Sequence, residues 1–217
     1  GQIIPEEFLQ LSKNGFINIH ASLLPKWRGA APIQRAIMNL NEEIGVSVMQ
    51  IVEKLDSGPI MLKKKIKLNK EKNAEDISNE LSSIGAEIIS DCIDLIEIGK
   101  AKFVEQDHNQ ATYAKKISKE EAKINWKESS SKIIAQINGL YQNPGAWFLF
   151  KGDRYKVLKA TESDHNGEPG KVLDDQLVIA CGHNSIQIQE IQKQGKNIQK
   201  AKDFLLGSKI EKNLVLS

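Results

Sequence analysis

Three polar side chains near the start of the sequence could together carry out acyl transfer. Asn18 and His20 lie two residues apart in the segment GFINIHASLLP, and Asp56 follows in the turn segment EKLDSGPI. Because alternate residues of a strand point to one face, we expect the first two side chains to project together. A carboxamide and an imidazole can donate to a developing oxyanion, and a nearby carboxylate can orient the imidazole and hold its proton. We therefore predict that Asn18, His20 and Asp56 form a catalytic set.

Each of these residues has a simpler interpretation when it is taken alone. An asparagine and a histidine at a strand end are typical of a turn residue beside a hydrogen-bonded core histidine. An aspartate in a Ser-Gly-Pro turn is a common turn residue. The presence of all three in one α/β region, where ligands bind beyond the carboxyl ends of the strands, favours the catalytic interpretation.

The hydrophobic pattern of the first hundred residues predicts alternating helices and strands. The segment IGVSVMQIVE is apolar on both faces, which is typical of a strand covered on both sides in an α/β sheet. A long helix follows, and Asn73 or Asp76 could cap its start. The predicted elements are a strand end at residues 1–4, helices at 5–13, 30–40 and 74–98, and strands at 16–20, 44–53 and 59–67. This alternation predicts the α/β class, and we expect the strands to be parallel.

The sequence becomes more polar after about residue 100. The stretch from Lys102 to Trp126 has few apolar anchors, which indicates a connector. Beyond it the pattern predicts a capped helix at 129–142, short strands near 145–150, 153–161, 169–173, 176–181 and 184–191, and a last helix at 200–207. Short, closely spaced strands are typical of a small β-barrel. We therefore predict a first domain at residues 1–105, a linker at 106–119 and a second domain at 120–217.

Composition excludes several classes of protein. The 217 residues are 40% hydrophobic and 27% charged, and the net charge is only +2, which does not indicate a general nucleic-acid binder. No apolar run approaches the roughly 20 residues that a membrane span needs. We expect Cys92 and Cys181 to be two buried free thiols rather than a disulfide.

Three segments of the sequence carry a resemblance to a known family. INIHASLLPKWRGAAPIQRAI, GVSVMQIVEKLDSGPIM and TYAKKISKEEAKINW closely resemble the methionyl-tRNA formyltransferases, within the folate-dependent formyltransferase superfamily. The segment RGAAPIQ discriminates most, because glycinamide ribonucleotide formyltransferases share the earlier pattern and differ after it. The resemblance implies a Rossmann-like formyltransferase domain, present here in part, followed by a small OB-fold-like β-barrel.

The resemblance also implies roles for individual residues. Asn18, His20 and Asp56 match the catalytic trio of the family. Lys116 matches a basic position that the family places near the tRNA acceptor end, although a solvated charged helix explains the same lysines equally well. The residues that match the folate-lining segment are Ser22, Leu23, Leu24 and Pro25.

The implied reaction transfers a formyl group from 10-formyltetrahydrofolate to the amino group of methionyl initiator tRNA. We expect no metal, a monomer and a cytoplasmic location, and the other three histidines (His108, His165 and His183) are expected at the surface. Trp27, Trp126 and Trp147 are expected to pack rather than to stack on bases. Because the chain starts in mid-element, we expect an isolated chain of poor stability and weak or no activity.

Two other interpretations stay open at this point. The first is a formyltransferase that acts on a sugar amine or a nucleotide. The second is an inactive tRNA-binding fragment, against which the intact Asn18, His20 and Asp56 argue.

Overall fold

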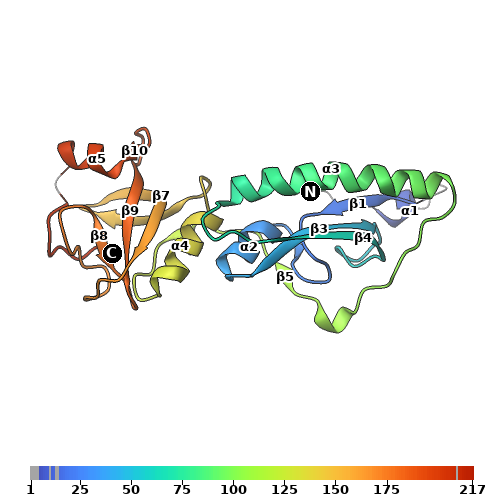
Figure 1. Cartoon of the computed structure of the whole chain (residues 1–217), viewed down its shortest axis with the longest axis horizontal. Coiled ribbons are helices and arrows are strands. Elements are labelled where there is room, and N and C mark those ends of the chain that lie inside the picture. Colours follow the sequence, from blue (N-terminus) through green and yellow to red (C-terminus); the bar gives the residue numbers. More distant parts are fainter. Residues whose placement is uncertain (1–4, 10, 13–14, 209) are drawn as a thin grey trace. The chain divides into compact units, whose positions relative to one another are not determined.

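The computed structural model describes residues 5–9, 11–12, 15–208 and 210–217, so the predicted strand end at residues 1–4 lies outside the described residues. The chain divides into two compact units. The N-terminal unit comprises residues 1–36 and 41–117, and the C-terminal unit comprises residues 37–40 and 118–217. Figure 1 labels many of the helices and strands of both units.

An antiparallel sheet lies at the centre of the N-terminal unit. Its strand order is β1–β3–β4, with β1 at Ile17–His20, β3 at Glu43–Gln50 and β4 at Ile60–Lys67. The three predicted strands are thus present, but the expectation of parallel strands is wrong for this sheet, since both pairings are antiparallel. The connection between β3 and β4 covers residues 51–59, contains no crossover helix and reverses the chain, which gives antiparallel neighbours.

Strand β3 is buried on both faces, as its apolar sequence predicted. Every residue from Ile44 to Met49 is buried. Helix α3 (Ala74–Glu97) packs against this strand and runs along the sheet in Figure 1. Close approach is possible at Gly85, where an added Cβ would lie 3.1 Å from Cγ2 of Ile19.

Both residues proposed to cap helix α3 take part in its cap. The Asn73 side chain accepts from the backbone N–H groups of Glu75 and Asp76, and the Asp76 carboxylate accepts from the Asn73 N–H at 3.1 Å. This reciprocal arrangement is a capping box, which satisfies amide donors that the first helical turn leaves free.

Short elements complete the N-terminal unit. Helix α1 covers Glu6–Leu9, α2 covers Pro32–Met38, and the 3-10 helix η1 covers His108–Gln110. Strands β2 (Arg28–Gly29) and β5 (Tyr113–Ala114) form a two-stranded parallel pair. This pair ties the loop that follows β1 to a segment more than eighty residues later in the chain.

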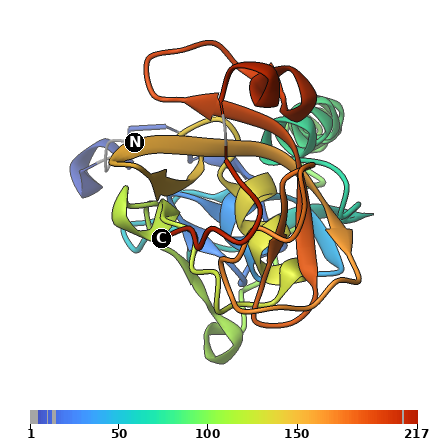
Figure 2. The ribbon, with the colours of Figure 1, turned by 90° about the vertical axis from the view of Figure 1, so that its left-hand side faces the viewer.

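The C-terminal unit contains a strongly curved five-stranded sheet, on which α4 packs against β7 (Figure 2). The order is β10–β9–β7–β6, and β8 also pairs with β9. Its elements are η2 (Glu120–Ala122), α4 (Ser130–Gly139), β6 (Ala146–Phe150), β7 (Asp153–Ser163), β8 (Val178–Ala180), β9 (Ser185–Lys193), β10 (Gln199–Lys200) and α5 (Ala201–Gly207).

One predicted strand of this unit is wrong. The segment 169–173 makes only isolated bridges, from Lys171 to Val215 and from Val172 to Ile179. A turn that ends at Gly170, where φ is +86°, and a second turn at residues 174–176 leave only three residues between them, too few for a continuous ladder.

A large apolar core lies within the C-terminal unit. Phe148 is fully buried, stacks on Tyr155 at 5.7 Å between ring centroids and contacts Trp126 at 5.8 Å. The buried Trp126 is therefore a packing residue, as predicted. Cys92 and Cys181 are both buried and free, which confirms the expectation of two buried free thiols rather than a disulfide.

Candidate active site

His20 ends strand β1 with its imidazole buried. Its Nε2 lies 2.9 Å from the carbonyl oxygen of Trp27, and because a carbonyl only accepts, that nitrogen carries a proton. Nδ1, the other ring nitrogen, lies 3.7 Å from Oδ2 of Asp56, with both side chains largely shielded from solvent. The imidazole is thus held from one side and faces a carboxylate on the other.

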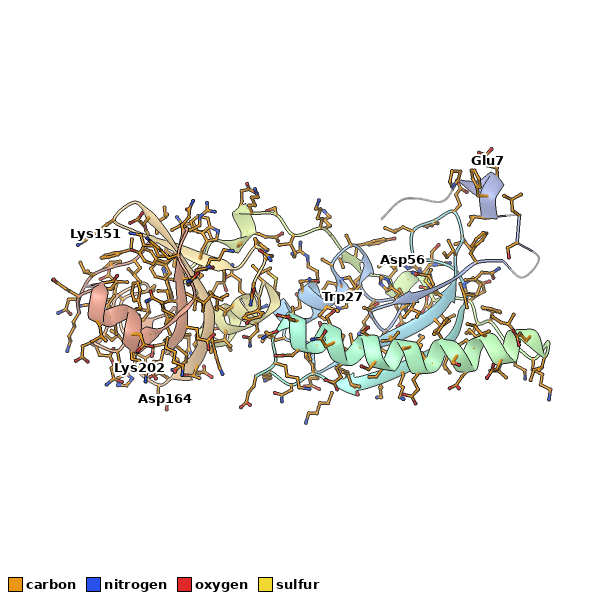
Figure 3. All side chains as sticks on the ribbon, turned by 90° about the horizontal axis from the view of Figure 1, so that it is seen from above. Glu7, Trp27, Asp56, Lys151, Asp164 and Lys202 are labelled. Carbon is orange, nitrogen blue, oxygen red and sulfur yellow. The ribbon has the colours of Figure 1, made fainter. Side chains whose placement is uncertain are left out.

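Asp56 reaches the histidine from the turn between β3 and β4. Its Oδ2 accepts a hydrogen bond of 2.8 Å from the backbone N–H of Gly29. The backbone of Asp56 lies in the left-handed region, at φ 46°, which costs about 1 kcal/mol or more for a residue with a side chain. Trp27 and Asp56 are labelled in Figure 3, on the N-terminal unit. Asp56, which we predicted as part of the catalytic set, therefore points toward the imidazole.

Gly29 is required at its position for two reasons. Its φ is +115°, and an added Cβ would lie 2.9 Å from the carbonyl oxygen of Ala114. The parallel pair β2–β5 therefore holds Gly29 so that its N–H points at the Asp56 carboxylate. Only a residue without a side chain allows this approach.

Asn18 shares the face of β1 that carries His20, because the two residues are separated by one position in a strand. Register pairs Asn18 with Met49 and His20 with Ser47 on β3. Asn18 is half-buried, and its carboxamide makes no hydrogen bond to another residue that the structure describes. Its N–H groups are therefore available to an incoming ligand.

The segment predicted to line a folate site is held in place by hydrogen bonds to Ser47 on β3. Ser47, which is fully buried, donates through Oγ to the carbonyl oxygen of Ser22 at 2.7 Å and accepts from the Leu24 N–H at 3.1 Å. Ser22 and Leu24 are themselves buried, whereas Leu23 and Pro25 are half-buried. The segment thus offers a ligand its backbone and these two half-buried residues.

Two of the predicted folate-lining residues, Ser22 and Leu23, also line a cavity of about 320 Å³. Lys26, Trp27 and residues 41–44 complete its walls, and none of the three catalytic candidates lies among its lining residues. A larger cavity of about 610 Å³ belongs to the C-terminal unit, where Lys159, Lys200 and Lys202 are among its lining residues.

Sequence reasoning missed three residues that build the site. Arg28 and Gln106 are both buried, and the guanidinium donates to the Gln106 Oε1 from Nη2 at 2.7 Å. The Thr112 hydroxyl accepts from the Trp27 N–H at 2.9 Å. Gln106 and Thr112 fall in the polar stretch that we predicted as a linker, and no periodicity distinguishes them there. The one available signal is the resemblance of the nearby TYAKK segment.

The remaining predicted residues have simple environments. Lys116 is exposed, and its carbonyl oxygen accepts from Nη2 of Arg35 at 3.3 Å. The three other histidines are exposed as predicted, although Nδ1 of His108 lies 3.0 Å from Nη2 of Arg28. The exposed Lys116 ammonium is free to meet a ligand, and its role as a tRNA contact stays a prediction.

The thiols offer no nucleophile among the described residues. Burial raises the pKa of the Cys181 thiol to about 11, and burial together with the Asp91 carboxylate raises the pKa of Cys92. Thiolate is the reactive form, so both groups are inert near neutral pH. The chemistry that remains is that of the imidazole, the carboxylate and the carboxamide, which suits acyl transfer.

Comparison with known families matches both parts of the chain. Residues 1–93 match the family described as formyl transferase, and residues 116–209 match the formyl transferase C-terminal domain. The chain is 54% identical over 213 residues to the methionyl-tRNA formyltransferase of Pelagibacter ubique, covering 98% of this chain and 69% of that protein. It is 41% identical to the enzyme of the same name from Thermodesulfovibrio yellowstonii, covering 99% of this chain and 70% of the relative.

Solved structures show the same fold at lower identity. HypX from Aquifex aeolicus, in complex with tetrahydrofolic acid, matches with a TM-score of 0.70 and 16% identity over 91% of this chain and 38% of its own. The sugar 3N-formyl transferase WlaRD, in the presence of dTDP and 5-N-formyl-THF, matches with a TM-score of 0.69 and 23% identity. The match covers 91% of this chain and 71% of that protein. Methionyl-tRNA formyltransferase from Clostridium thermocellum matches with a TM-score of 0.60 and 20% identity, over 76% of this chain and 70% of that protein.

Proposed function

The chain belongs to the methionyl-tRNA formyltransferase family, and from this premise we propose that Asn18, His20 and Asp56 carry its transfer of a formyl group to the amino group of methionyl initiator tRNA. The observation that carries the proposal is the approach of the Asp56 carboxylate to the His20 imidazole at 3.7 Å. Members of this family are formyl-transferring enzymes, and the wider resemblance assigns 10-formyltetrahydrofolate as donor.

The three side chains have complementary tasks in this proposal. Asn18 donates its free N–H to the formyl oxygen, on which negative charge develops as the amine attacks. His20 takes up the proton of the attacking amine at Nδ1, since its Nε2–H is engaged by the Trp27 carbonyl. The imidazolium then returns a proton to N10 of the folate as the bond between N10 and the formyl carbon breaks, which leaves tetrahydrofolate and neutral His20. Asp56 stabilises the imidazolium that results and is itself kept in place by the Gly29 N–H. Removing one such general base costs about 10²–10⁴-fold in rate.

The residues present fit the reacting end of the folate. When bound, 10-formyltetrahydrofolate supplies the activated formyl group. Asn18 provides a donor that has no other partner among the described residues. The backbone after His20 is held by Ser47, which pairs with His20 in the sheet and donates to the Ser22 carbonyl. Leu23 and Pro25, the half-buried members of the predicted segment, are the side chains that we assign to folate contact.

Recognition of tRNA is assigned to the exposed Lys116 and to the C-terminal unit. We take the N-terminal unit as Rossmann-like, because α3 covers a sheet whose central strand is buried on both faces. The curved five-stranded sheet around one aromatic core supports an OB-fold-like barrel, a fold that commonly carries nucleic acid.

A sugar-amine formyltransferase is the sharpest rival, because such a transferase shares this fold at 23% identity. The test offers the full chain 10-formyltetrahydrofolate with either methionyl initiator tRNA or a dTDP-amino sugar and follows formylated product. We expect product with the tRNA alone. Product with the amino sugar, or with neither acceptor, would contradict the proposal.

A further inference from the structure

A buried guanidinium lies close to the turn that carries the catalytic aspartate. Arg28 is only 1% exposed, and its Nε and Nη2 donate to Oε1 of Gln106 at 3.2 and 2.7 Å. Nη2 also contacts Nδ1 of His108 at 3.0 Å. Among the residues that the structure describes, no carboxylate forms an ion pair with this cation. Burying a charge without a counter-charge costs free energy. The hydrogen bonds to Gln106 and His108 offset part of this cost, so they hold the guanidinium in one orientation.

Gln106 links the Arg28 guanidinium to the turn that carries Asp56. Its Nε2 donates to the carbonyl oxygen of Asp56 at 2.9 Å and to that of Gly58 at 2.7 Å. A guanidinium can only donate, so it engages the amide oxygen and directs the NH₂ group toward the turn. The buried carboxamide therefore uses both of its donors and accepts two bonds, with a single possible orientation.

The turn needs such support. Asp56 has a left-handed backbone at φ 46°, and an added Cβ at Gly58 would lie 2.0 Å from the carbonyl oxygen of Gln50. A turn that is both strained and tightly packed holds one position only if its free carbonyl groups are bound. Gln106 binds two of them, on either side of Ser57.

We infer that Gln106, oriented by the buried Arg28, is a positioning residue that fixes the Asp56 carboxylate opposite His20. Arg28 also lies between Trp27, whose carbonyl receives the His20 Nε2–H, and Gly29, whose N–H binds Asp56. Residues 27–29 and the Gln106 side chain together thus position both His20 and Asp56. This inference rests on the proposed roles of His20 and Asp56, and it adds a residue from outside the motifs that indicated them.

The test compares two substitutions at Gln106 in the full chain. Gln106→Met keeps the volume and removes every hydrogen bond, whereas Gln106→Glu keeps an acceptor for Arg28 but places oxygen against two carbonyl groups. Gln110→Met is the matched control, since Gln110 is exposed in the same segment and bonds only Asp107 among the described residues. Amide hydrogen exchange over residues 53–59 and the kinetics of formyl transfer are measured for each.

We expect exchange over residues 53–59 to rise about 10–100-fold at the buried Ser57 amide, which donates to the Lys54 carbonyl, in both Gln106 variants, because each loses two buried hydrogen bonds of the turn. In the formylation assay kcat should fall by a similar factor, with KM for both substrates changed less than about threefold. The control should match the parent chain in both measurements. In an Asp56→Asn background the Gln106→Met loss of kcat should largely disappear, because the residue acts through Asp56.

Several results would overturn the inference. Unchanged exchange over residues 53–59 in Gln106→Glu, or additive losses in the double variant, would show that the turn does not depend on this side chain. If Gln106→Met fails to fold, Gln106→Glu decides, since its carboxylate still pairs with Arg28. The exchange measurement needs no turnover, so a chain that formylates nothing would refute the proposed function and leave this test intact.

Discussion

Replacing Ser47 with alanine should loosen the loop that follows His20. The hydroxyl is fully buried on β3, donates to the Ser22 carbonyl at 2.7 Å and accepts from the Leu24 N–H at 3.1 Å. Ser22 and Leu24 are buried as well, so neither backbone group can turn to bulk water when the hydroxyl is removed. The substitution therefore leaves one buried donor and one buried acceptor unpaired.

The magnitude follows from these two groups. An unsatisfied buried polar group costs about 1–3 kcal/mol, and local relaxation recovers part of the sum. We therefore expect Ser47→Ala to lower the free energy of opening of the N-terminal unit by about 2–4 kcal/mol. This loss corresponds to amide exchange about 30–900-fold faster in β3, where exchange requires opening of the unit.

Hydrogen exchange over β1, β3 and residues 21–26 measures the effect. Ser83→Ala serves as the control, because the Ser83 hydroxyl is exposed on α3 and its one partner among the residues that the structure describes is the Asn79 carbonyl, at 3.2 Å. The control should change the opening free energy by less than about 0.5 kcal/mol. Exchange in Ser47→Ala within about threefold of the parent chain would refute the view that this hydroxyl anchors the loop.

Three further predictions concern other parts of the chain. Gly29→Ala should cost about 1–3 kcal/mol of stability in urea unfolding, because it adds a Cβ at positive φ against a carbonyl oxygen, whereas Gly207→Ala, which meets open space, should be neutral. The pKa of Cys181 rises from 9.0 to about 11, so the native thiol keeps its proton between these values and stability should fall as the pH rises through them. Cys181→Ala should show a smaller fall over that range, and an identical slope would count against the burial effect. Lys116→Ala should raise KM for tRNA about 3–10-fold and reduce the salt dependence of binding by about one charge, whereas the exposed Lys102→Ala should do neither.

The local pattern was sufficient to predict most elements of the fold. Burial on both faces of β3 and the cap of α3 at Asn73 follow directly from residue types and spacing. Strand direction was mispredicted because an apolar run indicates double burial and carries no information on pairing direction. The strand expected at 169–173 is not formed because turns at residues 168–170 and 174–176 flank it, and its composition otherwise resembles that of its neighbours.

The sequence predicted only some residues of the candidate site. Asn18 and His20 could be identified because they are polar residues in an apolar strand, and Asp56 because it lies in a recognisable turn segment. Arg28 and Gln106 could not be assigned in that way, because their contact joins positions 78 residues apart. Their polarity made them resemble surface residues, and only the three-dimensional contacts show that both are buried.

The most direct test of the account is the single-turnover rate of formyl transfer to methionyl initiator tRNA in the parent chain and in Asn18→Ala, His20→Ala and Asp56→Asn. A working trio predicts a loss of about 10²–10⁴-fold for His20→Ala, with smaller losses for the other two and unchanged unfolding midpoints. A His20→Ala chain that formylates the tRNA at the parental rate would contradict the assignment of this site.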